Sequence, residues 1–259
     1  MKKILVFSLI ISFFISSCKK EDVGGTNSME LKFDNIAGSA DLVLSTTTYT
    51  NATGENYTID KFDYYISNII LKKTDGTTYT VPQNKSYFLV KESDATSQKI
   101  EIEDVPVGDY NGITFTLGVD SLRCTKDISE RTGVLDPAAG GAGMYWVWNS
   151  GYIFLKMEGT STVSTLPGSL IQYHIGGFGG MTSPTINNIK TITLPFPSVA
   201  KVTRTIQPEA HILADAKKVL DGSTNISIAT NSMVMFSAKS VDIANNYKDM
   251  FLVDHIHND

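Results

Sequence analysis

Short segments in which apolar and polar residues alternate run through most of the chain, and this pattern restricts the fold more than any other feature. In residues 29–35, MELKFDN, apolar side chains alternate with charged or polar ones, so one face of an extended strand would be buried. Residues 109–119 repeat the pattern, and Asp75-Gly76 is a turn signal typical of a hairpin. Many short strands separated by turns predict an all-β protein, an antiparallel β-sandwich of immunoglobulin-like or cupredoxin-like shape.

One segment near the end of the chain predicts a helix. Ser240 is a candidate N-cap, and apolar Val241 and Tyr247 follow at helical spacing. We therefore expect a short C-terminal helix over residues 240–250. No repeat or interdomain linker interrupts the strand pattern, so we predict one β-sandwich domain over residues 28–259.

The N-terminus has the features of a bacterial lipoprotein signal. Met1-Lys2-Lys3 precedes an apolar run, residues 4–15, that is too short to span a bilayer as an ordinary membrane helix. Small residues then precede Cys18, as in a lipobox. We expect residues 1–17 to be a signal peptide and residues 18–27 a flexible tether that begins with a lipidated Cys18. The anchor would hold the protein at the outer membrane, on its periplasmic or cell-surface side; the alternative is an ordinary secretory signal with an incidental cysteine.

Charge and cysteine content narrow the possible partners. The formal net charge is −5, and loss of Lys2 and Lys3 with the signal peptide would make it −7. A mildly acidic chain without a basic patch argues against nucleic-acid binding. Once Cys18 is lipidated, Cys124 is the only other cysteine, so no internal disulfide is possible. Cys124 is then either a small buried residue or a soft metal ligand.

A long irregular segment ends in a pair of tryptophans. Residues 121–143 show no sustained period and finish in a glycine-rich stretch, and Trp146 and Trp148, the only tryptophans of the chain, follow. A loop of this length in a compact domain is more often functional than not. The tryptophans form either a hydrophobic plug or the wall of a site, and we favour the wall. Asp120, just before the loop, either orients an imidazole or is structural.

The histidines are the candidate metal ligands. His255 and His257 are two residues apart, so in an extended strand both imidazoles point to one face, and imidazole suits copper and zinc. His174 lies at a strand end, opposite the apolar face of that strand, whereas we interpret His211 as structural. No zinc-protease helix, phosphate loop or nucleophile elbow is present, so we expect a binding protein rather than an enzyme.

Several segments together resemble the MbnP-like copper-binding family, which includes envelope proteins and lipoproteins of Bacteroidetes. The resemblance covers nearly all of the chain after the signal peptide. The matching segments are FDYYISNIIL (62–71), VPVGDYNGITFTLGVDS (105–121), LDP (135–137), GMYWVWNSGYIFLKMEG (143–159), YHIGGF (173–178) and VDHIHN (253–258).

The resemblance implies a β-sandwich that binds copper through histidines and a kynurenine derived from tryptophan. It also implies a partner, a dihaem peroxidase of the MauG type, that oxidises the tryptophan. Carried over to this chain, His174 with Trp146 or Trp148 beside it matches the pattern best, and His255 and His257 are a feature of the lipoprotein branch.

Two main functions remain open from the sequence. The first is an envelope lipoprotein that binds copper, with zinc as the other candidate ion. The second is a surface-anchored binding or adhesion module whose aromatic loop holds a glycan or a protein. A third hypothesis is that the protein is an accessory subunit of a surface uptake system, which only the tether supports.

Overall fold

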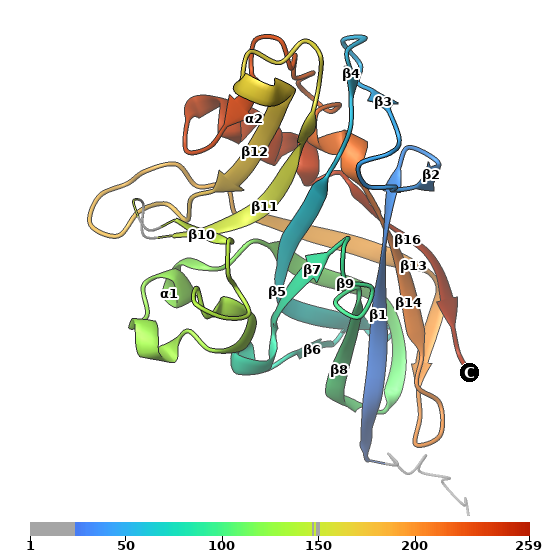
Figure 1. Cartoon of the computed structure of the whole chain (residues 1–259). Helices are drawn as coiled ribbons and strands as arrows, with labels where there is room; N and C mark the ends of the chain where they lie inside the picture. Colours follow the sequence, from blue (N-terminus) through green and yellow to red (C-terminus); the bar gives the residue numbers. More distant parts are fainter. Residues whose placement is uncertain (1–23, 147, 149–150) are drawn as a thin grey trace, which may run out of the picture.

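Two β-sheets face each other around one large core (Figure 1). The computed structural model describes residues 24–146, 148 and 151–259. The predicted signal peptide and Cys18 lie outside these residues. None of the helices in the described part is long and apolar enough to cross a bilayer. The all-β sandwich with a short C-terminal helix is confirmed.

The strands divide unequally between the two sheets. The five-stranded sheet contains β1 (Thr26–Ala37), β2 (Ala40–Asp41), β8 (Lys99–Pro106), β14 (Glu209–Asp215) and β16 (Phe251–His257). The nine-stranded sheet contains β5 (Lys61–Lys73), β6 (Thr78–Thr80), β7 (Tyr87–Lys91), β9 (Gly108–Leu117), β10 (Tyr145–Trp146), β11 (Gly151–Thr160), β12 (Leu170–Gly176), β13 (Lys190–Val202) and β15 (Met233–Val234). A separate small hairpin joins β3 (Tyr49–Thr50) and β4 (Asn56–Tyr57).

Helical segments are short and lie between the strands. The α-helices are α1 (Ser121–Cys124) and α2 (Ala238–Tyr247). The 3₁₀-helices are η1 (Gln83–Lys85), η2 (Ile128–Glu130), η3 (Gly133–Leu135), η4 (Pro167–Ser169) and η5 (Ala216–Val219).

β1 is central to the five-stranded sheet. Its buried residues alternate with partly exposed ones, as the sequence pattern predicted, because every second side chain faces the core. β8 pairs with it in the antiparallel direction, but β14 runs parallel to it. β16 then pairs antiparallel to β14 and forms the end of the β16-β14-β1-β2 order.

β5 occupies the corresponding place in the nine-stranded sheet. β11 pairs with its first residues, 61–64, and β9 with residues 66–73. β7 pairs with residues 63–67 and β6 with residues 70–72. The predicted hairpin after β5 is confirmed: Lys72 pairs with Thr78, and Gly76 in the turn has a φ of 88°, which glycine adopts without strain. Most of β5 is buried on both faces, so the outer face of this sheet is covered as well.

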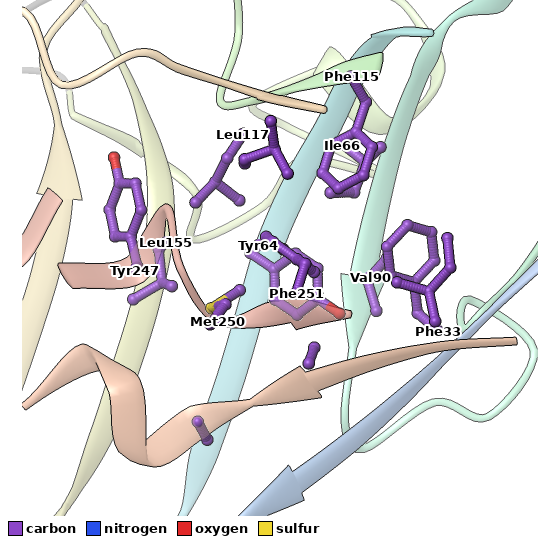
Figure 2. Close-up of a cluster of buried hydrophobic side chains, with 14 of the residues drawn as sticks. Phe33, Tyr64, Ile66, Val90, Phe115, Leu117, Leu155, Tyr247, Met250 and Phe251 are labelled. Atoms are coloured by element: carbon purple, nitrogen blue, oxygen red, sulfur yellow. The ribbon is translucent and has the colours of Figure 1, made fainter. Parts of the chain in front are cut away.

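Aromatic side chains from both sheets meet in the main core. Figure 2 shows Phe33 of β1, Phe251 of β16, Tyr64 of β5 and Phe115 of β9 in one cluster. Their rings meet edge to face, with centroids 5.1 Å apart for Phe115 and Phe251 and 6.2 Å apart for Phe33 and Tyr64. This arrangement contributes favourable quadrupole contacts in addition to buried area. The cluster joins the two sheets.

A second, smaller core covers the outer face of the nine-stranded sheet. Tyr65, Tyr152 and Phe154 point away from the main core and pack against the segment that the sequence marks as an irregular loop. That segment is built from α1, η2, η3 and turns rather than from a long open loop. It buries Cys124 and ends at Trp146.

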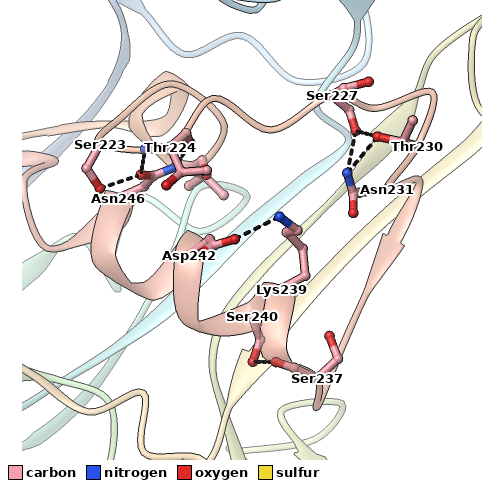
Figure 3. A network of polar contacts seen from close by, with 11 residues as sticks. Ser223, Thr224, Ser227, Thr230, Asn231, Ser237, Lys239, Ser240, Asp242 and Asn246 are labelled. Carbon is pink, nitrogen blue, oxygen red and sulfur yellow. Dashed lines mark hydrogen bonds and ion pairs between the residues drawn. The ribbon is translucent and has the colours of Figure 1, made fainter.

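The helix α2 leads directly into the last strand. It begins at Ala238, and its N-cap is Ser237, three residues before the predicted N-cap Ser240. Ser240 lies inside the first turn, where its hydroxyl donates to the carbonyl of Ser237 (Figure 3). The same hydroxyl accepts from the side chain of Asn188. Asn246, near the other end, hydrogen-bonds the segment around Ser223 and Thr224. These bonds fix the helix, and therefore the start of β16.

Candidate metal centre

A β-bulge in β16 turns two neighbouring side chains to the same face of the five-stranded sheet. His255 pairs with His211 of β14, but Val253 is the next paired residue, opposite Ile212, so Asp254 is an extra residue in the ladder. Such an insertion interrupts the alternation of a strand. Val253 is buried against the core, whereas Asp254 and His255 both lie beside His211.

Three imidazoles and a carboxylate gather at this bulge. Oδ2 of Asp254 lies 2.6 Å from Nδ1 of His255 and 3.7 Å from Nδ1 of His211. On the other side of its ring, Nε2 of His255 lies 2.9 Å from Nε2 of His257. Among the described residues, His211, Asp254 and His255 are the one group of possible metal ligands whose atoms lie within 4.8 Å of one another. We call His211, Asp254, His255 and His257 together the histidine–aspartate cluster.

His211 has two buried ring nitrogens without a hydrogen-bond partner among the residues that the structure describes. Its side chain is 12% exposed, and Oδ2 of Asp34 lies 3.1 Å from its Nε2, but not in the direction of a hydrogen bond. A buried polar group without a partner costs about 1–3 kcal/mol. An ion on Nδ1 would satisfy one nitrogen, and Asp34 would orient the ring from behind, as carboxylates do for metal-bound histidines.

The donor set fits a transition metal. Imidazole nitrogen suits copper and zinc, and a carboxylate oxygen is a common additional ligand. The side chains of Asp254 and His255 are 50% and 42% exposed, so an ion can enter from solvent. Cys124 takes no part, because it lies in the smaller core on the other sheet, where burial raises the pKa of its thiol to about 12.

His174 lies on the other sheet, in β12. It pairs with Lys156 of β11, and its Nε2 is hydrogen-bonded to Oε1 of Glu158 at 2.7 Å. Burial lowers the pKa of His174, the ammonium group of Lys156 adds to this effect, and Glu158 opposes it. Burial also acts to raise the pKa of Glu158, but the hydrogen bond from His174 and the charge of Lys156 outweigh it and lower that pKa. His174 is thus a buried, hydrogen-bonded side chain.

His174, Glu158 and Lys156 form a polar row on this sheet, and the glycine-rich stretch before the tryptophans covers it. Nζ of Lys156 donates to the carbonyl oxygen of Gly143. Asp63 of β5, which pairs with Lys156 on the other side, is also buried, and burial raises its pKa. The row therefore joins three strands beneath the covering segment.

The two tryptophans have different roles in the fold. Their ring centroids are 5.2 Å apart, but Trp146 is 5% exposed and Trp148 is 63% exposed. Trp146 packs over Gly176, two residues from His174 in β12, where an added Cβ would lie 2.8 Å from the indole ring. Trp146 is therefore a plug, as one of the two interpretations proposed. Trp148 forms part of the wall of a pocket of about 240 Å³, as the other proposed.

The structure divides the predicted ligand set between the two sheets. His174 and Trp146 lie on the covered face of the nine-stranded sheet, and His255 and His257 lie on the outer face of the five-stranded sheet. The sequence pattern could not show this, because it does not state which strands share a sheet. The pocket wall and the pair of C-terminal imidazoles are separate features.

The sequence suggested that Asp120 either orients an imidazole or is structural, and in the fold its hydrogen-bond partners include no imidazole among the described residues. Its carboxylate caps α1 by accepting from the backbone N–H of Arg123, and it also accepts from Tyr87, Asn68 and Gln83. The hydrogen bond from Tyr87 and the N-cap bond lower its pKa against the opposing effect of burial. Asp120 is thus a capping residue. Cys18, the predicted lipidation site, lies outside the described residues.

Sequence reasoning left His211 out of the site. Its position between buried Ala210 and Ile212 could have indicated an outward-facing side chain in an otherwise apolar strand. The pairing of β14 with β16, which brings His211 next to His255, is not visible in the sequence. Asp254 was missed as well, because a regular strand would have turned it and His255 to opposite faces.

The fold and the cluster together define a class of β-sandwich proteins with a histidine-rich surface site. The sequence model of the MbnP family matches residues 26–237. This chain belongs to the MbnP family. The solved structure of MbnP from Methylosinus trichosporium is similar, with a TM-score of 0.52 and 12% identity over 90% of this chain and 99% of that chain. No curated protein sequence matches the chain.

The family match ends before the cluster is complete. It stops at residue 237, directly before α2. His211 lies inside the matched range, whereas Asp254, His255 and His257 lie beyond it, in β16. Residues from both sides of this boundary thus contribute to the cluster.

Proposed function

We propose that this protein binds a copper ion at the histidine–aspartate cluster, through His211, His255 and Asp254, with His257 at its solvent side. The observation that carries the proposal is the buried Nδ1 of His211, which has no hydrogen-bond partner among the described residues and lies 3.7 Å from Oδ2 of Asp254, beside the ring of His255. Membership of the MbnP family, a copper-binding family, supports copper as the ion. Zinc has the same preference for imidazole and is the competing ion.

Binding rather than catalysis is the proposed role. The ligands supply nitrogen and oxygen donors at the surface of a rigid sheet, and the carboxylate of Asp34 behind His211 has a position suited to orient that imidazole. The proposed ligand set replaces His174, whose Nε2 is engaged by Glu158, with His211.

Metal titration of the purified protein tests the proposal. Cu(II) and Zn(II) are titrated in competition with a chelator of known affinity, and the EPR spectrum of the copper form reports nitrogen ligation. We expect tight binding that His211→Ala weakens and that the matched substitution on the other sheet, His174→Gln, leaves unchanged. Equal loss in both variants, or no tight binding by the native protein, would refute the site.

We also propose that the protein is held at the outer membrane by a lipidated Cys18. The support is the lipobox-like sequence before this residue. Metabolic labelling with a fatty acid should mark the native protein and not Cys18→Ser. A labelled variant, or an unlabelled native protein, would argue for an ordinary secretory signal.

Oxidation of a tryptophan by a MauG-type dihaem peroxidase is a further part of the proposal. Trp148 supports it, because an exposed indole that stacks on a buried one is accessible to a partner protein. Peptide mass spectrometry of protein from its natural host should detect kynurenine at Trp146 or Trp148. Unmodified tryptophan at both positions in protein from that host would remove this part.

A second candidate function is a binding module for a glycan or protein. The exposed Trp148 in the wall of the 240 Å³ pocket, beside Phe236 and Met181, favours it. Screening on immobilised glycans in excess chelator separates the two functions. Binding that persists in chelator and is lost in Trp148→Ala would favour the module.

A further inference from the structure

Two different ligand sets approach the imidazole of His255 from opposite sides of its ring. Nδ1 faces the carboxylate of Asp254 at 2.6 Å, and the same carboxylate oxygen lies 3.7 Å from Nδ1 of His211. Nε2 faces Nε2 of His257 at 2.9 Å. Both contacts are hydrogen bonds, and an ion on either side of the ring would take the place of the proton that the two partners share. A ring with a candidate ligand beside each of its nitrogens can serve two ions at once. A second ion at this ring would be additional to the single copper ion of the proposed function.

The inner side of the ring offers a partly buried position. His211, Asp254 and His255 contribute one ligand atom each within 4.8 Å. The carboxylate of Asp34 lies behind His211, 3.1 Å from its Nε2. This is the position used in the proposed function, and it does not require His257.

The outer side of the ring offers an exposed position with its own ligands. Two nitrogens bound at right angles to one ion, with bonds of about 2.0–2.1 Å, lie about 2.9 Å apart. Nε2 of His255 and Nε2 of His257 have this separation. His257 also lines a pocket of about 410 Å³ together with Glu209, its partner across the strand pair, and Asp259, so carboxylates are available to complete this position.

We propose that the histidine–aspartate cluster holds two transition-metal ions, one on each side of the His255 ring, with this imidazole shared between them. The proposal rests on the proposed function and extends it. When both nitrogens of His255 bind ions, the ring gives up its remaining N–H proton to solvent water. The inner ion is then held by His211 and Asp254, and the outer ion by His257 and the carboxylates of its pocket.

Stoichiometry tests the proposal. The purified protein is titrated with Cu(II) against a competing chelator, and tightly bound copper is counted after desalting. We expect two equivalents for the native protein and for His174→Gln, one for His211→Ala, one for His257→Ala, and none held tightly by His255→Ala. Circular dichroism and thermal unfolding of each variant without metal verify that it is folded.

EPR gives an independent readout. Two Cu(II) ions that share an imidazole couple magnetically, so the signal intensity per copper should fall as the second equivalent binds. In His211→Ala and His257→Ala the intensity should match the copper content.

The failure of this proposal differs from failure of the proposed function. One equivalent in the native protein, retained in His257→Ala, would overturn the second position and leave the inner site standing. One equivalent that is bound more weakly in His257→Ala would make His257 a ligand of a single ion and would also overturn it. No tight binding by the native protein would refute both proposals.

Discussion

Histidines lie on the outer faces of both sheets, but in opposite surroundings. His174 is covered by the segment that ends at Trp146 and is hydrogen-bonded to Glu158. His211 and His255 lie on a face where their carboxylate neighbours face solvent and where the ring of His211 has no hydrogen bond to any described residue. The covered face uses its histidine to satisfy a buried polar row. On the open face the ring of His255 is hydrogen-bonded to two other candidate ligands, Asp254 and His257, and the ring of His211 is available to an ion.

The difference shows that residue type and strand position do not by themselves define a ligand. Both faces present alternate side chains of a strand, and both place a carboxylate near an imidazole. What separates them is the number of imidazoles that lie close together and the presence of one imidazole, His211, whose ring nitrogens have no hydrogen-bond partner among the described residues.

Trp146→Ala should cause the largest effect, and it should act on the covered face alone. Removing this buried ring from its place over Gly176 should lower the free energy of unfolding by about 3–5 kcal/mol, because the covering segment loses its plug. Chemical denaturation measures the change. Metal affinity at the cluster should stay within about twofold of native.

Trp148→Ala is the matched control for that substitution. Its side chain is 63% exposed, so the loss should be limited to the stacking with Trp146, about 0.5–1.5 kcal/mol. Equal losses for the two tryptophans would contradict the assignment of one as a plug and the other as an exposed wall.

Asp254→Ala should cause the largest loss on the open face. The carboxylate lies between the rings of His255 and His211, so its removal should weaken metal binding about 100-fold, equivalent to about 2.7 kcal/mol. Competition titration measures the loss. Asp249→Ala removes an equal charge from an exposed position nearby in sequence and should have little effect; a similar loss there would reduce the role of Asp254 to general electrostatics.

Asp34→Asn should have a smaller effect on the same face. The carboxylate is positioned to orient His211 rather than to bind the ion, and substitution of such residues costs about 10-fold in affinity or somewhat more, equivalent to about 1.4 kcal/mol. The EPR spectrum of the copper form should keep its nitrogen ligation. Loss as large as that of Asp254→Ala would instead make Asp34 a direct ligand.

The sequence predicted the open face only in part. The two-residue spacing correctly indicated that His255 and His257 share a face of an extended strand, because that inference needs only local geometry. Adding His211 requires the pairing of β14 with β16, and adding Asp34 requires the parallel pairing of β1 with β14. Both pairings join segments far apart in the chain, so no local pattern contains them.

The covered face was predicted with similar limits. His174 does lie opposite Tyr173 and Ile175, which are buried in the main core, as alternation required. The approach of Trp146 to the same strand depends on how the segment before it packs over the sheet. Alternation assigned both tryptophans to one face and could not distinguish the buried ring from the exposed one.

The smallest expected effect is a change in how the free energy of unfolding depends on pH, and it should come from His174 on the covered face. The folded state holds the pKa of His174 below its ordinary value near 6.5, mainly through burial. The unfolded chain therefore binds a proton at this ring more readily than the folded chain does. The contribution of neutral His174 to the free energy of unfolding is complete above pH 6.5 and is lost as pH falls below that value. Glu158, whose pKa is below its ordinary value of 4.5, contributes in the same direction only below that pH.

Denaturation of the metal-free protein between pH 7 and pH 5 isolates the histidine. We expect the free energy of unfolding to fall less steeply with decreasing pH in His174→Gln than in the native protein, because the glutamine side chain does not titrate. An unchanged slope in His174→Gln would show that the ring accepts a proton as easily when folded as when unfolded. In that case the contrast between a satisfied covered histidine and an available open one would not hold.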